Sequence, residues 1–208
     1  MSPITLSKRT YRDVLAVAIA FIMTLCSPFA LAHVGQGDIA GGFSSGFVHP
    51  INGWDHVLAM VAVGIWGAQL GRPAIWALPV TFPIVMAFGG VLGAFGIAIP
   101  GIEAGIAVSA LALGLAIAFA ARPPLAVAAT IVAIFAIFHG HAHGTELPES
   151  ANAMAYSLGF VMATGLLHAF GIAIGEVNRQ KHGANVLRVI GALIGAGGVY
   201  FLFAALKG

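Results

Sequence analysis

Five of the eight histidines fall in two short groups that also contain carboxylates. The first group is H-P-I-N-G-W-D-H at residues 49–56, and the second is F-H-G-H-A-H-G-T-E at residues 138–146. Imidazole and carboxylate together suit borderline first-row divalent ions such as Ni²⁺, Co²⁺, Zn²⁺ and Cu²⁺. Mg²⁺ and Ca²⁺ prefer oxygen ligands alone. The two groups therefore predict a site for a divalent transition metal.

The rest of the chain is strongly apolar, which makes these groups stand out. Its 208 residues are 60% hydrophobic and only 8% charged, and the mean hydropathy is +0.99. This composition is typical of a polytopic helical membrane protein. At membrane depth an Asp, Lys or Arg costs ~2.5–3.5 kcal/mol on insertion scales, so clustered ionisable groups indicate a function. The few basic residues form no patch, so we expect a lipid bilayer as partner and no nucleic acid.

Residues 1–32 have the features of a secretory signal peptide. Basic residues precede an apolar run at 14–25, and A-L-A at 30–32 is typical of a cleavage site. Cleavage would leave His33 at the new N-terminus, where its α-amine and imidazole together can chelate an ion. The alternative is an uncleaved first membrane helix, although the apolar run is shorter than the ~20 residues of a span. The only cysteine, Cys26, lies in this segment, so the mature chain is expected to lack disulfides and thiolate ligands.

The remainder of the chain, residues 33–208, predicts one all-α domain that spans the bilayer six times. A Gly-rich polar stretch runs to about His49, and Gly- and Pro-rich breakers separate the apolar segments that follow. These six segments are residues 54–71, 74–96, 101–121, 124–143, 151–175 and 184–206. The expected fold is therefore a polytopic helical bundle, and the sequence leaves open whether it forms a homo-oligomer.

The charges of the loops predict the orientation of this bundle in the membrane. If the mature N-terminus is outside, the basic loop residues all lie on one side: Arg72, Arg122, Arg179 and Lys181. The positive-inside rule assigns that side to the cytoplasm. We therefore expect a protein of the bacterial inner membrane, with both mature termini in the periplasm.

This orientation places both histidine groups at the outer face. The first group lies at the outer end of the first span and the second at the outer end of the fourth. His139 and His143 stand four apart and share a helix face, whereas His141 points about 200° away around the axis. The candidate metal ligands are His49, Asp55, His56, Glu103, His139, His141, His143 and Glu146. Whether they close around one ion or two is open, and His168, deep in the fifth span, is either a packing residue or a relay or exit ligand.

Both motifs resemble signatures of a known family. H-P-x-x-G-x-D-H-x-x-x-M-x-x-V-G at residues 49–64 and F-H-G-H-A-H-G-T-E at 138–146 are similar to the two signatures of the HupE/UreJ family of hydrogenase and urease accessory proteins. The resemblance implies a permease for nickel, or for cobalt in some members, that supplies metal for enzyme assembly. The resemblance also implies functional residues in both motifs. Phe82 and Glu103 resemble two further functional positions of the family. The positions implied within the motifs are His49, Asp55, His56, His139, His143 and Glu146.

The residues by themselves leave two other classes of protein open. A membrane-embedded hydrolase could hold a catalytic Zn²⁺ with these histidines and use Glu103 or Glu146 as base. A haem-binding bundle needs histidines on facing helices near mid-membrane, whereas most of these lie at one end. The chain has no P-loop motif, so we expect a secondary transporter, not an enzyme, with a transported ion and no prosthetic group.

Overall fold

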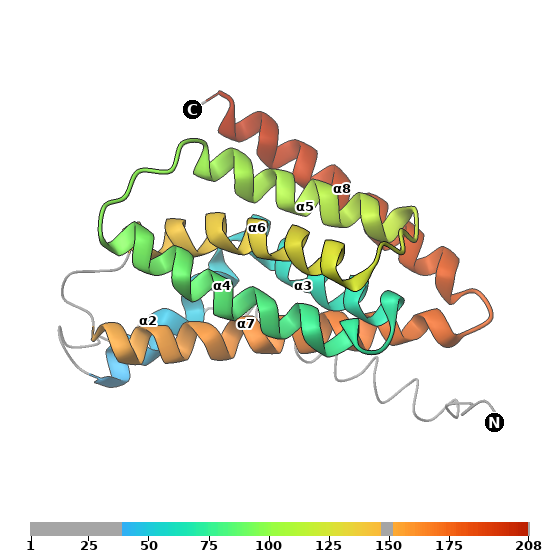
Figure 1. The fold of residues 1–208 in the computed structure, drawn as a ribbon, viewed down its shortest axis with the longest axis horizontal. Coiled ribbons are helices and arrows are strands. Elements are labelled where there is room, and N and C mark those ends of the chain that lie inside the picture. The colour runs from blue at the N-terminus through green and yellow to red at the C-terminus, as the bar shows by residue number, and fades with distance from the viewer. Residues whose placement is uncertain (1–38, 147–151, 208) are drawn as a thin grey trace. The chain divides into compact units, whose positions relative to one another are not determined.

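The computed structural model describes residues 39–146 and 152–207, which all belong to one compact unit of the chain. Over these residues the regular structure is entirely helical (Figure 1), which confirms the all-α prediction. The helices are α2 (Ile39–Asn52), α3 (Trp54–Leu70), α4 (Ala74–Ala94), α5 (Ile102–Ala118), α6 (Leu125–Thr145), α7 (Ala153–Gly175), η1 (Glu176–Arg179) and α8 (Gly183–Ala205). The expected signal peptide and His33 lie outside the described residues.

Each of the six expected spans coincides with one helix from α3 to α8, with ends that differ by at most three residues. Four of these helices are long and apolar enough to cross a membrane: α4, α6, α7 with η1, and α8. Helix α5 is apolar but has only 17 residues, which rise about 26 Å against a hydrocarbon core of ~30 Å. Six crossings therefore remain a prediction, and four candidate spans are established.

The Gly-rich stretch before the first expected span is helical as well, although the sequence suggested a polar connection. Helix α2 lies along α7, and Gly46 packs directly on the backbone of Tyr156. Gly159 packs in the same way on Phe43. Small residues allow helix backbones to approach this closely. These glycines therefore serve packing, and α2 carries His49 in its last turn to the start of α3.

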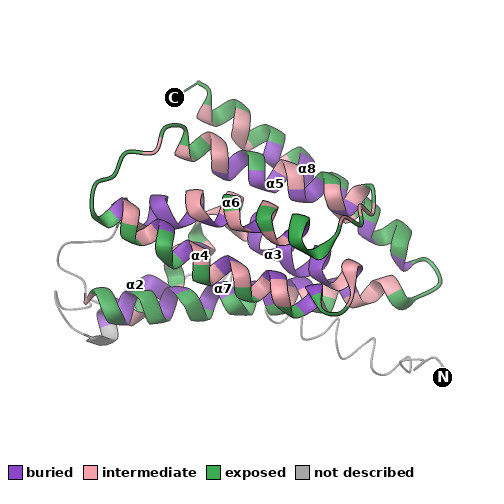
Figure 2. Cartoon of the chain, in the orientation of Figure 1, coloured by how far each residue is buried: buried purple, intermediate pink, exposed green. Residues whose placement is uncertain are grey.

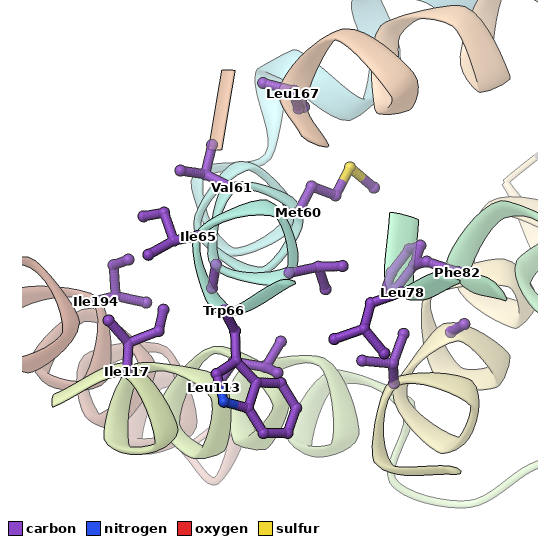
Figure 3. Close-up of a cluster of buried hydrophobic side chains, with 14 of the residues drawn as sticks. Met60, Val61, Ile65, Trp66, Leu78, Phe82, Leu113, Ile117, Leu167 and Ile194 are labelled. Atoms are coloured by element: carbon purple, nitrogen blue, oxygen red, sulfur yellow. The ribbon is translucent and has the colours of Figure 1, made fainter. Parts of the chain in front are cut away.

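Helix α3 is the centre of the bundle, because it contacts α2, α4, α5, α7 and α8. Its middle is buried on all sides (Figure 2). Met60, Ile65 and Trp66 of α3 pack against buried side chains of the surrounding helices (Figure 3). The indole Nε1 of Trp66 also donates a hydrogen bond to the carbonyl of Ala121 at 3.0 Å. A central helix held in this way fixes the position of Asp55 and His56 in its first turn.

Helices α4 and α6 form a second close pair through glycines. Gly140 of α6 lies against the carbonyl of Met86, and Gly144 lies against the carbonyl of Gly90. Because Gly140 lies between His139 and His141, this contact also sets the position of the second histidine group. The seam between α4 and α6 is thus part of the framework of the site.

Replacing Gly140 with alanine is expected to destabilise the protein. The added Cβ would clash with the backbone of Met86, and overpacking of this kind costs about 1–3 kcal/mol of unfolding free energy. Gly165→Ala is the matched control, because no atom lies within 4 Å of its added Cβ. Thermal unfolding in detergent would show a lower Tm for Gly140→Ala alone. An equal Tm for both variants would contradict the proposed close contact.

Candidate metal site

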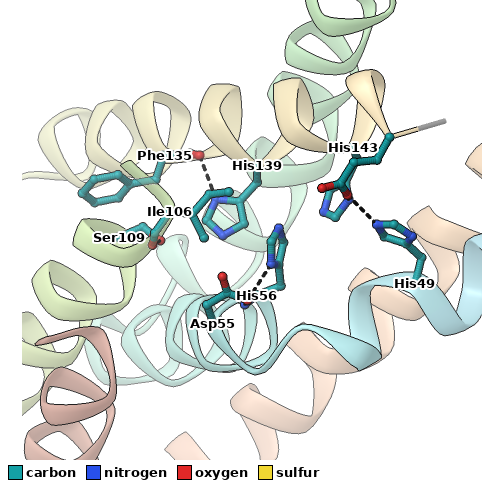
Figure 4. A network of polar contacts seen from close by, with 9 residues as sticks. His49, Asp55, His56, Ile106, Ser109, Phe135, His139 and His143 are labelled. Atoms are coloured by element: carbon teal, nitrogen blue, oxygen red, sulfur yellow. Dashed lines mark hydrogen bonds and ion pairs between the residues drawn. The ribbon is translucent and has the colours of Figure 1, made fainter. Parts of the chain in front are cut away.

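Two helix ends and two helix starts surround a pocket with a volume of about 380 Å³. The end of α2, the start of α3, the start of α5 and the end of α6 contribute its walls (Figure 4). Its lining residues are His49, Asn52, Gly53, Asp55, His56, Glu103, Ala142, His143 and Glu146. The fold therefore brings the two sequence motifs together, although helices α4 and α5 lie between the helices that carry them.

The more exposed end of the pocket holds His49, His143 and Glu146. Nε2 of His49 donates to Oε2 of Glu146 at 3.0 Å, and Nδ1 of His143 lies 3.9 Å from the same oxygen. One ligand atom from each residue falls within 4.8 Å of the other two. The side chain of Glu146 is 53% exposed and that of His49 is 30% exposed. This group can bind an ion while solvent still reaches it.

Asp55 orients the imidazole of His56. Oδ1 of Asp55 accepts hydrogen bonds from both the backbone N–H and the ring Nδ1 of His56, each at 2.8 Å. The proton on Nδ1 leaves Nε2 with its lone pair, and this atom is buried without a hydrogen-bond partner among the residues that the structure describes. Histidine ligands of metals usually donate their other ring N–H to a carboxylate or carbonyl in this way. The pair is therefore arranged as a ligand and its orienting group.

His139 shows the same arrangement one step deeper. Its Nδ1 donates to the carbonyl of Phe135 at 3.0 Å, and its Nε2 is buried with no hydrogen-bond partner in the described part of the chain. The residue has no exposed surface. A buried acceptor without a partner is costly in a folded protein, so this nitrogen is well suited to a cation.

The imidazoles of the two motifs form a continuous row. The distance between ring centroids is 4.8 Å from His49 to His143, 4.5 Å from His143 to His56, and 4.8 Å from His56 to His139. His139 and His143 share one face of α6, as their spacing predicted, and His56 of α3 lies near both (Figure 4). The row runs from the partly exposed His49 to the fully buried His139.

Three further candidates, Glu103, His141 and Phe82, are not part of this row. Glu103, at the start of α5, lines the pocket. His141 does not join the row, since its Nε2 donates to the carbonyl of Ile97 at 2.6 Å, which agrees with its different direction on the helix. Phe82 of α4 is fully buried, and its ring contacts those of both His139 and His168.

Two aromatic residues of α7 belong to the site but were not among the sequence candidates. The ring of Phe160 lies 4.3 Å from that of His143, and the ring of Tyr156 lies 5.8 Å from that of His49. The hydroxyl of Tyr156 is buried and has no hydrogen-bond partner among the described residues. The sequence indicated these two residues only through their spacing, because Tyr156 and Phe160 stand four apart in an apolar segment. What they face is shown only by the packing of α2 on α7.

Imidazoles and carboxylates at one end of an apolar helical bundle define the class: a membrane protein with a candidate transition-metal site. Residues 21–201 match the family model of the HupE / UreJ proteins, and the chain belongs to this family. Protein HupE of Rhizobium leguminosarum bv. viciae is 47% identical over 173 residues, which cover 83% of this chain and 91% of that protein. No solved structure matches the chain. The resemblance inferred from the two motifs is thereby confirmed.

Proposed function

We propose that this protein is a secondary permease for a divalent transition metal, with Ni²⁺ as the first choice and Co²⁺ as the second. It takes the ion from the periplasm to the cytoplasm for the assembly of a metalloenzyme. The observation that carries this proposal is the imidazole row, which leads from the partly exposed His49 to the fully buried His139 inside an apolar bundle. Membership of the HupE/UreJ family and the resemblance of both motifs support the same function.

Capture begins at the exposed end of the row. The carboxylate of Glu146 attracts the hydrated cation, and the imidazoles of His49 and His143 replace part of its water. Nitrogen and oxygen ligands of this kind suit Ni²⁺ and Co²⁺. Because Glu146 remains 53% exposed, the ion keeps water contacts and can leave again, as conduction requires.

The ion then moves inward by exchange of ligands. His143 lies next to both His49 and His56, so the ion can gain the Nε2 of His56 before it loses its outer ligands. The carboxylate of Asp55 offsets part of the positive charge at this depth, where an unpaired charge is costly. Asp55 thereby serves the ion through His56 and needs no direct bond to it.

Charge distribution supports uptake from the periplasm. The pocket lies at the start of α3 and the end of α6, while Arg72 and Arg122 follow α3 and precede α6 at the opposite ends of those helices. The positive-inside rule assigns the arginine side to the cytoplasm. Under this proposal the pocket faces the periplasm, as do both mature termini.

Uptake of radiolabelled Ni²⁺ and Co²⁺ into proteoliposomes, each competed by Zn²⁺, tests the proposal. We expect saturable flux of Ni²⁺ or Co²⁺ and only partial competition by Zn²⁺. The hydrolase alternative predicts a different result, namely tightly retained stoichiometric zinc, hydrolytic turnover and no flux. That outcome would replace the proposed function.

A further inference from the structure

His168 lies deep in α7 with both ring nitrogens unsatisfied. Its exposed fraction is 1%, and neither Nδ1 nor Nε2 makes a hydrogen bond of good geometry to the described residues. Buried polar groups in native proteins are nearly always paired, so an exception requires an explanation. The outer row does not include this residue, although the ring of Phe82 contacts both His139 and His168.

Two oxygens are available as partners for this imidazole. The carbonyl of Pro79 on α4 interacts with the ring, and it cannot accept the usual helical hydrogen bond because Pro83, four residues later, has no N–H. The hydroxyl of Thr164 is fully buried and has no hydrogen-bond partner among the described residues, and Thr164 stands four residues before His168 on the same face of α7. An apolar part of the bundle thus offers one imidazole, one carbonyl and one hydroxyl.

The ring of Phe82 contacts both this group and the inner end of the outer row. Its centroid lies 5.3 Å from that of His139 and 5.3 Å from that of His168. The two imidazoles are therefore no farther apart than twice this distance. The path from the outer row to His168 is accordingly short and is bordered by this phenyl ring.

We infer that His168 is a second binding station for the divalent metal cargo, assisted by the hydroxyl of Thr164 and the carbonyl of Pro79. Phe82 contacts the imidazoles of both this station and the outer one. The mixed nitrogen and oxygen ligands select the same borderline divalent ions as the outer row. The inference rests on the proposed function, and it extends the path of the ion beyond the pocket.

The number of ions bound to the purified full-length protein tests this station. Equilibrium dialysis with radiolabelled Ni²⁺ would show one ion fewer for His168→Ala than for the wild type, while binding at the outer site stays unchanged. Uptake into proteoliposomes should fall at least tenfold. His182→Ala is the matched control, because His182 is an exposed histidine before α8 and its loss should change neither quantity.

Thr164→Val provides a second variant that keeps the side-chain shape. Loss of its hydroxyl should lower uptake severalfold without changing outer-site binding. Wild-type binding and uptake in both His168→Ala and Thr164→Val would overturn the deep station and leave the proposed function intact. Absence of Ni²⁺ and Co²⁺ binding in the wild type would instead overturn the proposed function.

Discussion

Replacing His56 with alanine is expected to abolish metal uptake. The imidazole of His56 lies between those of His143 and His139, at centroid distances of 4.5 and 4.8 Å. Its loss removes the ligand that connects the exposed part of the row to the buried part. Changes to groups that only orient a metal ligand already cost 10–100-fold, so we expect a loss of about 100-fold or more. The measurement is the initial rate of radiolabelled Ni²⁺ uptake into cells that express equal amounts of protein in the membrane.

His182→Ala again serves as the control, because it removes an exposed imidazole outside the pocket. Its uptake should equal that of the wild type. Equal accumulation of Ni²⁺ in cells that express His56→Ala and in cells that express the wild type would refute the role assigned to His56.

Replacing Asp55 should produce the second largest effect, because this carboxylate both orients His56 and carries negative charge. Asp55→Ala removes both contributions and is expected to lower uptake by about 100-fold, whereas Asp55→Asn keeps a hydrogen-bond acceptor and should lose about tenfold. Nickel uptake and equilibrium binding measured on both variants separate the two contributions. Equal losses in both variants would show that the charge alone matters.

A carboxylate outside the pocket provides the control for this series. Glu176 forms an ion pair with the exposed Arg179 at 2.9 Å, and exposed pairs of this kind contribute little to stability. Uptake by Glu176→Ala should therefore match the wild type. A tenfold loss in this variant would show that removal of any acidic residue impairs the protein, and Asp55 would lose its special role.

The positions of the helices could be predicted from the sequence because apolar length is a local property. Runs of apolar residues separated by Gly and Pro gave all six helices from α3 to α8 within three residues of their ends. The regular alternation of these helices then placed residues 49–56 and 138–146 at one end. The helical period also separated His141 from His139 and His143, and its hydrogen bond to Ile97 agrees with that separation.

Other features depend on contacts that a local pattern does not contain. Glycine is typical both of loops and of closely packed helices, so Gly46 and Gly159 did not reveal that α2 packs on α7. Likewise, adjacent Asp55 and His56 suggested two ligands. The hydrogen bond between them shows instead which nitrogen of His56 is left free.

The place of His143 in the row has a consequence for transport kinetics. Its ring neighbours both His49 and His56. An ion bound by His143 and His49 therefore prevents a second ion from binding to His143 and His56. Ions would then enter in single file, and each must clear His143 before the next is accepted. Under the proposed function, the time for which His143 stays occupied limits how soon the next ion can enter, and raising the external metal concentration beyond saturation brings no further flux.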